Sequence, residues 1–284
     1  MQRARALWHR LELVHAVVYF DDTPRDAFTD AGLRGFWMGY FAGRSAPMGP
    51  VGAAVVTAAF FNFHPAMVRR ALPDAWTFAT PDAVLDARRT STAAALRHIA
   101  PGTDDLAAAL APLLERAIAS APDAGRPLFA ANRALEQPDD PVERLWLAAT
   151  CLREHRGDGH VAALTSLGID GCEAHVLSAA WKRLPPQMIL DSRGWSEDDW
   201  AAATDRLRSR GWIDGDGVLT SQGREVREQI EAHTDVLAFA PYRVLGDDVS
   251  SVLDGLQPFA EAVVESGVVR FPNPMGLPAT PDAP

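Results

Sequence analysis

The sequence predicts a mainly α-helical protein made of two related units, each with several helices and a small β-hairpin, fused in one chain as an internal pseudo-dimer. The first observation behind this prediction is a repeated pattern, A-[F/L]-T-x-x-G-[L/I]-x-G, found at residues 27–35 and again at 163–171. The same offset joins three further identical pairs without a gap: Pro50 and Pro186, Trp76 and Trp212, Arg88 and Arg224. Such a repeat indicates a duplicated unit. The second observation is a series of helix caps and glycine stops after residue 184.

The composition fits one large or two modest domains. The chain has 284 residues, of which 48% are hydrophobic, and this allows sizeable cores. No apolar run reaches the roughly 18 residues of a membrane span, and the N-terminus lacks the features of a signal peptide. Cys151 and Cys172 form neither a disulfide framework nor a zinc set, so a cytoplasmic location is expected. The net charge of −10 argues against nucleic-acid binders, which usually carry a basic surplus.

Residues 1–118 are predicted to form the first and more degenerate unit. The apolar stretch PVGAAVVTAAFFNF, residues 50–63, supplies the helix before the turn. The stretch HPAMVRRAL, residues 64–72, supplies a shortened helix after it. PDAWTFATPD, residues 73–82, stands in place of the hairpin and has no glycine at its tip. A longer helix is expected from Pro81 onward, since proline is tolerated in a first helical turn.

Residues 119–140 are predicted to connect the two units, and residues 141–284 to form the second unit with C-terminal helices. Proline, glycine and aspartate punctuate the connecting segment, which includes a short helix near residues 128–135. In the second unit, a short helix is expected to start near Leu184, where two prolines follow, and to end at Gly194.

The remaining elements of the second unit are marked more clearly. Ser196 caps a helix with acids in its first turn and arginines in its last, as the helix dipole favours. Gly211 ends this helix. The stretch WIDGDGVLT, residues 212–220, is typical of two short strands joined by a tight turn, and Thr220 caps the next helix. Helix, turn, helix, hairpin, helix is the order of a winged helix-turn-helix.

The second unit and the whole chain each resemble a known family. RLRSRGWIDGDGVLTSQGREVREQIEAHTD, residues 206–235, resembles the C-terminal half of a MarR-type winged helix, and this resemblance extends from about residue 184. The whole chain resembles an actinobacterial helix-turn-helix family with MarR-like units, through the motifs YFAGRSAPMG, GRPLFAAN and REHRGDGH. The resemblance implies a fold and no particular reaction.

The surface expected for DNA reading has the wrong charge. In MarR-type proteins the second helix of the motif reads the major groove and the wing contacts phosphates. Here Glu197, Asp198 and Asp199 head that helix, and Asp214 and Asp216 lie at the wing tip. The available arginines lie at the far end of the helix, or on the first unit: Arg206, Arg208, Arg210, Arg69 and Arg70. Strong DNA binding is therefore not expected.

The stretch REHRGDGH, residues 153–160, is the main candidate for a binding site. At the repeat offset its counterpart is the apolar and aromatic VVYFDDTP, residues 17–24. One interpretation places a set of polar side chains against an aromatic wall that includes Tyr19, lining a ligand pocket; the polar set is His155, Arg156, Asp158 and His160. The alternative is a solvated helix end in which Gly157-Asp158-Gly159 forms an ordinary C-cap.

Two further residues are candidates for the same pocket. His64 in FFNFHP is either a ligand-binding side chain or a capping or core histidine. Arg44 in FAGRSAPMG is expected to be buried and so to need an anion, either Asp21 or Asp22 or a ligand carboxylate. Arg126 and Asn132 are weaker candidates of the same kind, and Asn62 is expected in a turn.

Three functions follow from these patterns. The first is a small-molecule-binding protein on a winged-helix scaffold that has lost strong DNA binding. The second is a MarR-type transcription regulator, which rests on fold alone. The third is an enzyme with a histidine general base, although no catalytic arrangement is recognisable. No metal site is expected, since His155 and His160 lack metal-ligand spacing; a haem held by one histidine stays open. The cofactor, any reaction, and the oligomeric state stay unknown.

Overall fold

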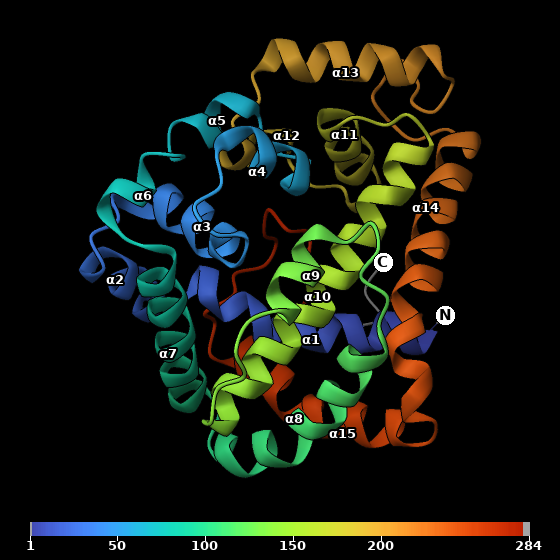
Figure 1. The fold of residues 1–284 in the computed structure, drawn as a ribbon. Coiled ribbons are helices and arrows are strands. Elements are labelled where there is room, and N and C mark those ends of the chain that lie inside the picture. The colour runs from blue at the N-terminus through green and yellow to red at the C-terminus, as the bar shows by residue number, and fades with distance from the viewer. Residues whose placement is uncertain (1, 281–284) are drawn as a thin grey trace.

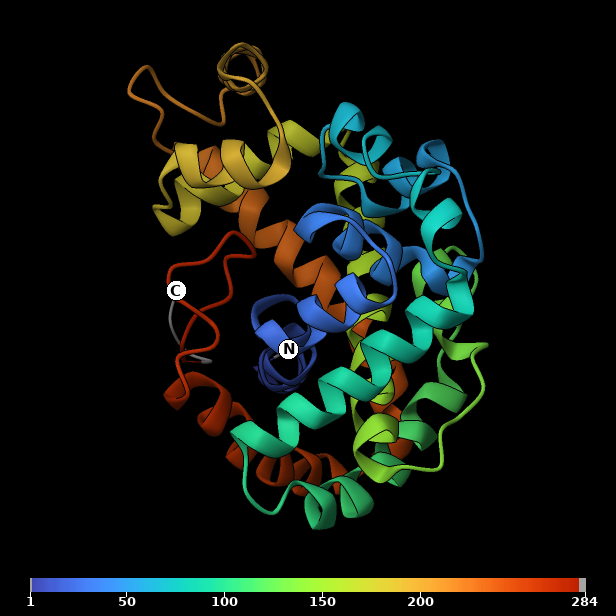
Figure 2. The same ribbon diagram turned by 90° about the vertical axis from the view of Figure 1, so that its left-hand side faces the viewer.

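The computed structural model describes residues 2–280, and helices dominate it (Figures 1 and 2). The elements before the predicted second unit are α1 (Gln2–Phe20), α2 (Asp22–Asp30), α3 (Gly35–Ser45), η1 (Ala46–Met48), α4 (Ala53–Phe60), α5 (Pro65–Arg69), α6 (Ala75–Phe78), α7 (Pro81–Ile99), α8 (Thr103–Ser120) and α9 (Pro127–Arg133). The others are α10 (Pro141–Ser166), α11 (Gly171–Lys182), α12 (Pro186–Arg193), α13 (Glu197–Ser209), α14 (Ser221–Phe239), η2 (Ala240–Leu245) and α15 (Asp248–Glu265). The prediction of a mainly helical protein is confirmed.

The main apolar core is built around α1 and α10, which lie side by side near the centre of the molecule (Figure 1). Helices α7, α8 and α15 pack around this pair. Fully buried side chains of this core include Leu7, Leu11, Leu145, Trp146 and Phe259. Since α15 packs on α1 and α8, the C-terminal helix completes a core that begins with the first helix.

A second, smaller core lies between α11, α13 and α14. It buries Leu207, Trp212, Ile213 and Ile230, with Trp195 and Trp200 partly covered against them. Helix α13 lies at the outer edge of this part, at the top of Figure 1 and seen end-on in Figure 2. One long side of α13 therefore faces outward.

The caps predicted for the second unit are confirmed. Ser196 accepts a hydrogen bond from Asp199 N, and the Asp199 carboxylate accepts one from Ser196 N, which is a capping box. Thr220 accepts from Gly223 N at the start of α14. Gly194 ends α12 in a left-handed conformation, with φ 75°, which glycine adopts without a steric penalty.

The predicted β-hairpin wings are wrong: among residues 2–280 no strand forms. The segment between α13 and α14 holds one isolated antiparallel bridge, Ile213 with Leu219. The carboxylate of Asp214 accepts hydrogen bonds from the backbone N–H groups of Asp216 and Val218, at 3.0 and 2.9 Å. Asp214 N still donates to the carbonyl of Val218 at 2.9 Å, but the Asp214 side chain takes the Val218 N–H that a strand ladder would have paired with the Asp214 carbonyl. In the first half, α6 occupies the place expected for the wing.

The internal duplication stays a prediction. The helices after Gly35 and those after Gly171 follow in a comparable order, but the two glycines differ in their surroundings. A Cβ on Gly35 would meet open space, whereas a Cβ on Gly171 would lie 2.3 Å from the carbonyl oxygen of Phe61. Superposition of residues 27–88 on 163–224 tests the duplication, and helices running in different directions would exclude it. The domain boundaries predicted above also stay predictions.

Candidate functional site

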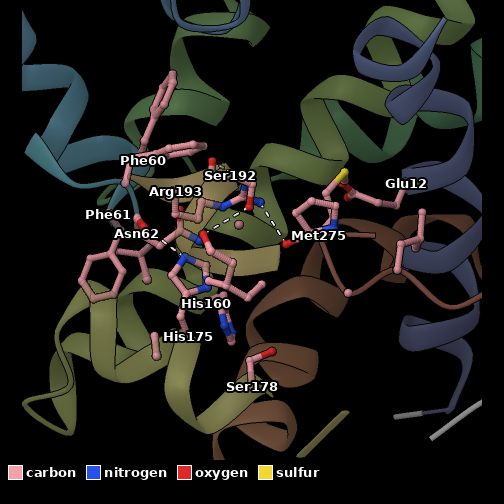
Figure 3. A pocket seen from close by; sticks show the side chains of 18 of the residues that line it. Glu12, Phe60, Phe61, Asn62, His160, His175, Ser178, Ser192, Arg193 and Met275 are labelled. Carbon is pink, nitrogen blue, oxygen red and sulfur yellow. Dashed lines mark hydrogen bonds between the residues drawn. The ribbon is translucent and has the colours of Figure 1, made fainter. Parts of the chain in front are cut away.

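A cavity of about 510 Å³ is the candidate site (Figure 3). Its lining comes from α11, α12 and α14 on one side and from α1, α3 and α10 on the other. Residues 274–278, which follow α15, border it as well. In Figure 2 this C-terminal segment runs from α15 past α1 toward α11 and α12. Segments far apart in the sequence thus meet around one space.

Aromatic side chains form much of the lining. Those from the first half and α11 are Trp8, Tyr19, Phe20, Phe36, Trp37, Tyr40, Phe60, Phe61, Phe63 and Trp181. The rings of α3 lie in contact with one another and with the segment after α4: Trp37 and Tyr40 have centroids 5.6 Å apart, and Tyr40 and Phe63 5.4 Å apart. An aromatic wall of this extent suits a flat or apolar ligand body.

A buried network of two arginines and two glutamates lies beside this wall. Arg44 donates two hydrogen bonds to Glu154, at 2.9 and 3.0 Å. Arg153 pairs with Glu154 at 2.9 Å and with Glu12 at 3.1 Å. Burial alone would raise the pKa of Glu154, but the two guanidinium groups outweigh it and hold that pKa well below its usual range. Each guanidinium group of this network thus has a carboxylate partner, and Glu154 is shared by both.

The predicted partner of Arg44 is wrong. Asp21 caps α2 by accepting from Thr23 N, and Asp22 pairs with Arg25 at 2.9 Å. The anion is instead Glu154, which lies 110 residues further along the chain in the REHRGDGH stretch. The requirement for a buried anion was right, but its identity depends on how α3 and α10 pack.

Tyr19 lies in the cavity wall and is oriented by a histidine. Thr150 Oγ1 donates to the carbonyl of Trp146 and therefore accepts from His15 Nδ1, 2.9 Å away. His15 Nε2 is then left to accept from the Tyr19 hydroxyl at 3.1 Å. Burial, with Arg153 nearby, lowers the pKa of His15 well below its usual value, which keeps this ring neutral. His15 was missed by sequence reasoning, although it precedes Tyr19 by four residues on one helix.

The REHRGDGH stretch is not a helix end; it lies inside the 26-residue helix α10. Two of its predicted site residues, Arg156 and His160, line the cavity, as does Gly157. Arg156 also pairs with Glu231 and with Asp235 of α14, at 3.0 and 3.1 Å. Positions four apart lie on one face of an α-helix, which explains why Arg156 and His160 point the same way.

His155 and Asp158 are buried on another face of α10, turned toward α9 and away from the cavity lining. The ring of His155 packs edge-on against Phe129, with centroids 4.9 Å apart. Asp158 accepts from the backbone N–H of Phe129 at 2.9 Å. Burial raises the pKa of Asp158 to about 6 and lowers that of His155 to about 3. These two residues fix α9 on α10 and do not line the cavity.

A glycine lets a third partner reach this face. Arg126 donates to the backbone carbonyls of His155 and Leu237, the second at 3.1 Å. A Cβ on Gly159 would lie 2.9 Å from the Arg126 guanidinium and 3.3 Å from Leu237 Cβ. Gly159 therefore allows α14 and Arg126 to approach α10. Asn132, the other weaker candidate, accepts a hydrogen bond from Arg88 at 3.0 Å. Neither Arg126 nor Asn132 lines the cavity.

His160 presents one ring nitrogen to the cavity. Thr234 Oγ1 donates to the carbonyl of Ile230 at 2.7 Å and accepts from His160 Nδ1 at 2.9 Å. This fixes the proton on Nδ1 and leaves Nε2 as an acceptor. Burial lowers the pKa of His160 to about 4, so the ring is neutral at pH 7.

His64 lies outside the cavity lining and caps a helix, as one of its two interpretations proposed. Its Nδ1 accepts from Ala66 N at 3.2 Å at the start of α5. Its ring packs edge-on against Trp195, with centroids 5.0 Å apart. Asn62, expected in a turn, lies between α4 and α5, where its carbonyl accepts from His175 and from Trp195, each at 3.0 Å.

Lys182 and Arg193 are among the cavity cations that sequence reasoning missed. Lys182 ends α11 and donates to the carbonyl of Gly276 at 2.7 Å. Arg193 ends α12 and donates to the carbonyl of Pro274 at 3.0 Å. A lysine or arginine in a last helical turn is ordinary, so the sequence alone carries no sign that either faces a cavity.

The arginines of α13 and the arginine at its C-cap are engaged within the chain. Arg206 donates to Glu173 and Asp170, at 2.8 and 2.5 Å. Arg208 donates to the carbonyls of Asp214 and Gly215. Arg210 donates to the carbonyl of Leu167 at 2.6 Å and lies over the ring of Trp212. Meanwhile Glu197 and Asp198 at the helix start are exposed.

Residues 2–280 offer neither a metal site nor a membrane span. No group of three or more His, Cys, Asp or Glu side chains in this range is arranged so that it could hold a metal ion. Nor does this range contain a helix long and apolar enough to cross a membrane.

A family model described as "Helix-turn-helix family" matches residues 4–270, nearly the whole chain. No curated protein and no solved structure matches the chain.

Proposed function

Because the chain belongs to this helix-turn-helix family, we propose that it is a helix-turn-helix protein that binds a small organic molecule in the cavity beneath α11 and α12. The observation that carries the proposal is the cavity itself. Its volume of about 510 Å³ lies within the range of roughly 300–1,000 Å³ typical of ligand sites. Its lining joins an aromatic wall to a few convergent polar groups, among them Arg156 and His160, which is the usual composition of such sites.

The surface of α13 supports a loss of strong DNA binding. Phosphate contacts supply most of the affinity of DNA-binding proteins. The two arginines of this helix and the arginine at its C-cap already donate to carboxylates or carbonyls of the chain. Glu197 and Asp198 are exposed where a reading helix would meet base edges. Binding DNA would bring these carboxylates close to phosphates.

A DNA-binding regulator is the second candidate. Membership of a helix-turn-helix family and the outward side of α13 (Figure 1) favour it, although fold does not fix function. A gel-shift assay with DNA upstream of the protein's own gene, at physiological salt, separates the two. Weak binding without sequence preference is expected, and sequence-specific affinity near 10⁻⁸ M or tighter, as in working regulators, would favour the regulator instead.

Native mass spectrometry of protein purified from its own host tests the ligand proposal. A bound molecule should remain on the wild-type protein. Ser178 lines the cavity from α11 (Figure 3), so Ser178→Trp should fill the space and remove the bound mass. Ser209→Trp on the exposed side of α13 is the matched control and should retain it.

Thermal unfolding first checks that Ser178→Trp and Ser209→Trp both fold, so that a lost ligand cannot be attributed to a lost fold. A bound mass that survives Ser178→Trp would place the ligand elsewhere and overturn the assignment of the cavity. A wild-type protein that carries no small molecule, and binds none of the aromatic probes described next, would overturn the proposed function as a whole.

A further inference from the structure

The charges around the cavity do not balance. Seven cationic side chains line it: Arg5, Arg44, Arg153, Arg156, Lys182, Arg193 and Arg227. Four carboxylates pair with five of them: Glu12, Glu154, Glu231 and Asp235. Within the described part of the chain, Lys182 and Arg193 form no ion pair. The lining therefore carries an excess of positive charge, and that excess is concentrated in these two side chains.

Arg193 is the more informative of the two. The residue is only 8% exposed, and its guanidinium lies over the ring of Phe63, 4.8 Å from the centroid. It donates to the carbonyls of Ser192 and Pro274, at 3.2 and 3.0 Å. Its Nε is buried with no hydrogen-bond partner among the described residues. A buried guanidinium without an anion is costly, and most buried donors in proteins are satisfied.

Lys182 has spare donors at the same border of the cavity. Of the three N–H groups of its ammonium, one goes to the carbonyl of Gly276. Burial, with Arg227 nearby, lowers the pKa of Lys182 to about 8, and burial also lowers the pKa of Arg193. For Lys182 the attraction of Glu231 and Glu12 does not offset the burial, and both directions are those expected for cations in a desolvated place.

Resting on the proposed function, we infer that the ligand is an organic anion, whose carboxylate or phosphate group is held by Lys182 and Arg193 and whose apolar body lies against the aromatic wall. The anion would supply the missing counter-charge and accept the unused donors. Charge-assisted hydrogen bonds of this kind are about twice as strong as neutral ones. Arg193 and Lys182 each donate one hydrogen bond to the C-terminal segment, to the carbonyls of Pro274 and Gly276. This segment therefore borders the place where the anion would bind.

Calorimetric titration with three matched probes tests the inference. 2-Naphthoate and 2-naphthamide share one aromatic body and differ in charge, and 2-naphthyl phosphate distinguishes a phosphate site from a carboxylate site. We expect an anionic probe to bind about tenfold or more tightly than the amide, as hydrogen bonds to charged groups imply. Whichever anion binds more tightly identifies the ligand class.

Variants that remove one charge show which side chains cause the preference for anionic probes. Lys182→Gln and Arg193→Gln should each reduce the preference for the anion to about threefold or less, while leaving the affinity for the amide nearly unchanged. Arg183→Gln removes the neighbouring exposed charge outside the cavity lining and should keep the full preference. Thermal unfolding of each variant checks that the fold persists.

Each result decides the matter. Equal affinity for 2-naphthoate, its phosphate counterpart and the amide would overturn the anion inference and leave the proposed function standing. A preference that persists in both cavity variants, or is lost in Arg183→Gln, would overturn the role of Lys182 and Arg193. If none of the probes binds at millimolar concentration, the anion inference fails, and native mass spectrometry then decides the proposed function separately.

Discussion

Replacing Glu154 with glutamine should destabilise the protein strongly at neutral pH. The Glu154 side chain is 1% exposed and is the shared acceptor of Arg44 and Arg153. Glutamine keeps the shape but removes the negative charge, so Arg44 is left buried without an anion. Breaking a buried ion pair by removing one partner costs about 3–5 kcal/mol. Arg153 keeps its contact with Glu12, which places the expected loss at about 3 kcal/mol.

The pH dependence has a definite sign. Because the pKa of Glu154 is lowered in the folded protein, its contribution to stability is complete above the unfolded-state pKa of about 4.3. This contribution is lost as the pH falls toward the folded pKa. The difference in free energy of unfolding between wild type and Glu154→Gln should therefore be constant from about pH 6 to 8 and shrink below about pH 4.3.

Urea unfolding followed by tryptophan fluorescence measures this difference. Glu228→Gln on the exposed side of α14 makes the same chemical change outside the network and should stay within about 0.5 kcal/mol of wild type. A loss below about 1 kcal/mol for Glu154→Gln, or a loss equally large at pH 3.5 and pH 7, would refute the reasoning from a buried charge network.

Three further changes have expected outcomes. Burial raises the pKa of Asp158 to about 6, so its carboxylate lowers the free energy of unfolding as the pH rises above about 4. The amide oxygen of Asp158→Asn can still accept from Phe129 N. Urea unfolding should therefore show that this variant is about 1–3 kcal/mol more stable than wild type at pH 8 and nearly equal at pH 4. Gly171→Ala would place a Cβ 2.3 Å from the Phe61 carbonyl oxygen, so a loss of about 2–3 kcal/mol is expected, and an unchanged unfolding midpoint would contradict this close approach. Leu277→Ala removes a side chain that is 2% exposed; it should cost about 2–3 kcal/mol and speed hydrogen exchange in residues 273–278, and a silent variant would show that this segment is not packed.

The sequence by itself determined helices α12, α13 and α14 and several of their ends. Ser196, Gly194 and Thr220 act within one turn of their own positions, and capping is a local interaction. The acidic start of α13 was also evident from sequence, because Glu197 and Asp198 need no distant partner to be exposed. The need of Arg44 for a buried anion could be predicted too, since the cost of burying a charge is general.

Only the tertiary structure decided the rest. The glycines of REHRGDGH favour a helix end by local propensity, at a cost of about 1 kcal/mol each within a helix, yet α10 continues through them. Packing outweighs that cost, because Gly159 admits Arg126 and Leu237. The predicted wing does not form strands, because the Asp214 side chain accepts from backbone N–H groups of its own turn. The cavity could be predicted only in part. Tyr19, Arg44, Arg156 and His160 were candidates and line it, but His155, Asp158 and His64 do not, because which face of α10 borders the cavity depends on how segments far apart in the sequence pack.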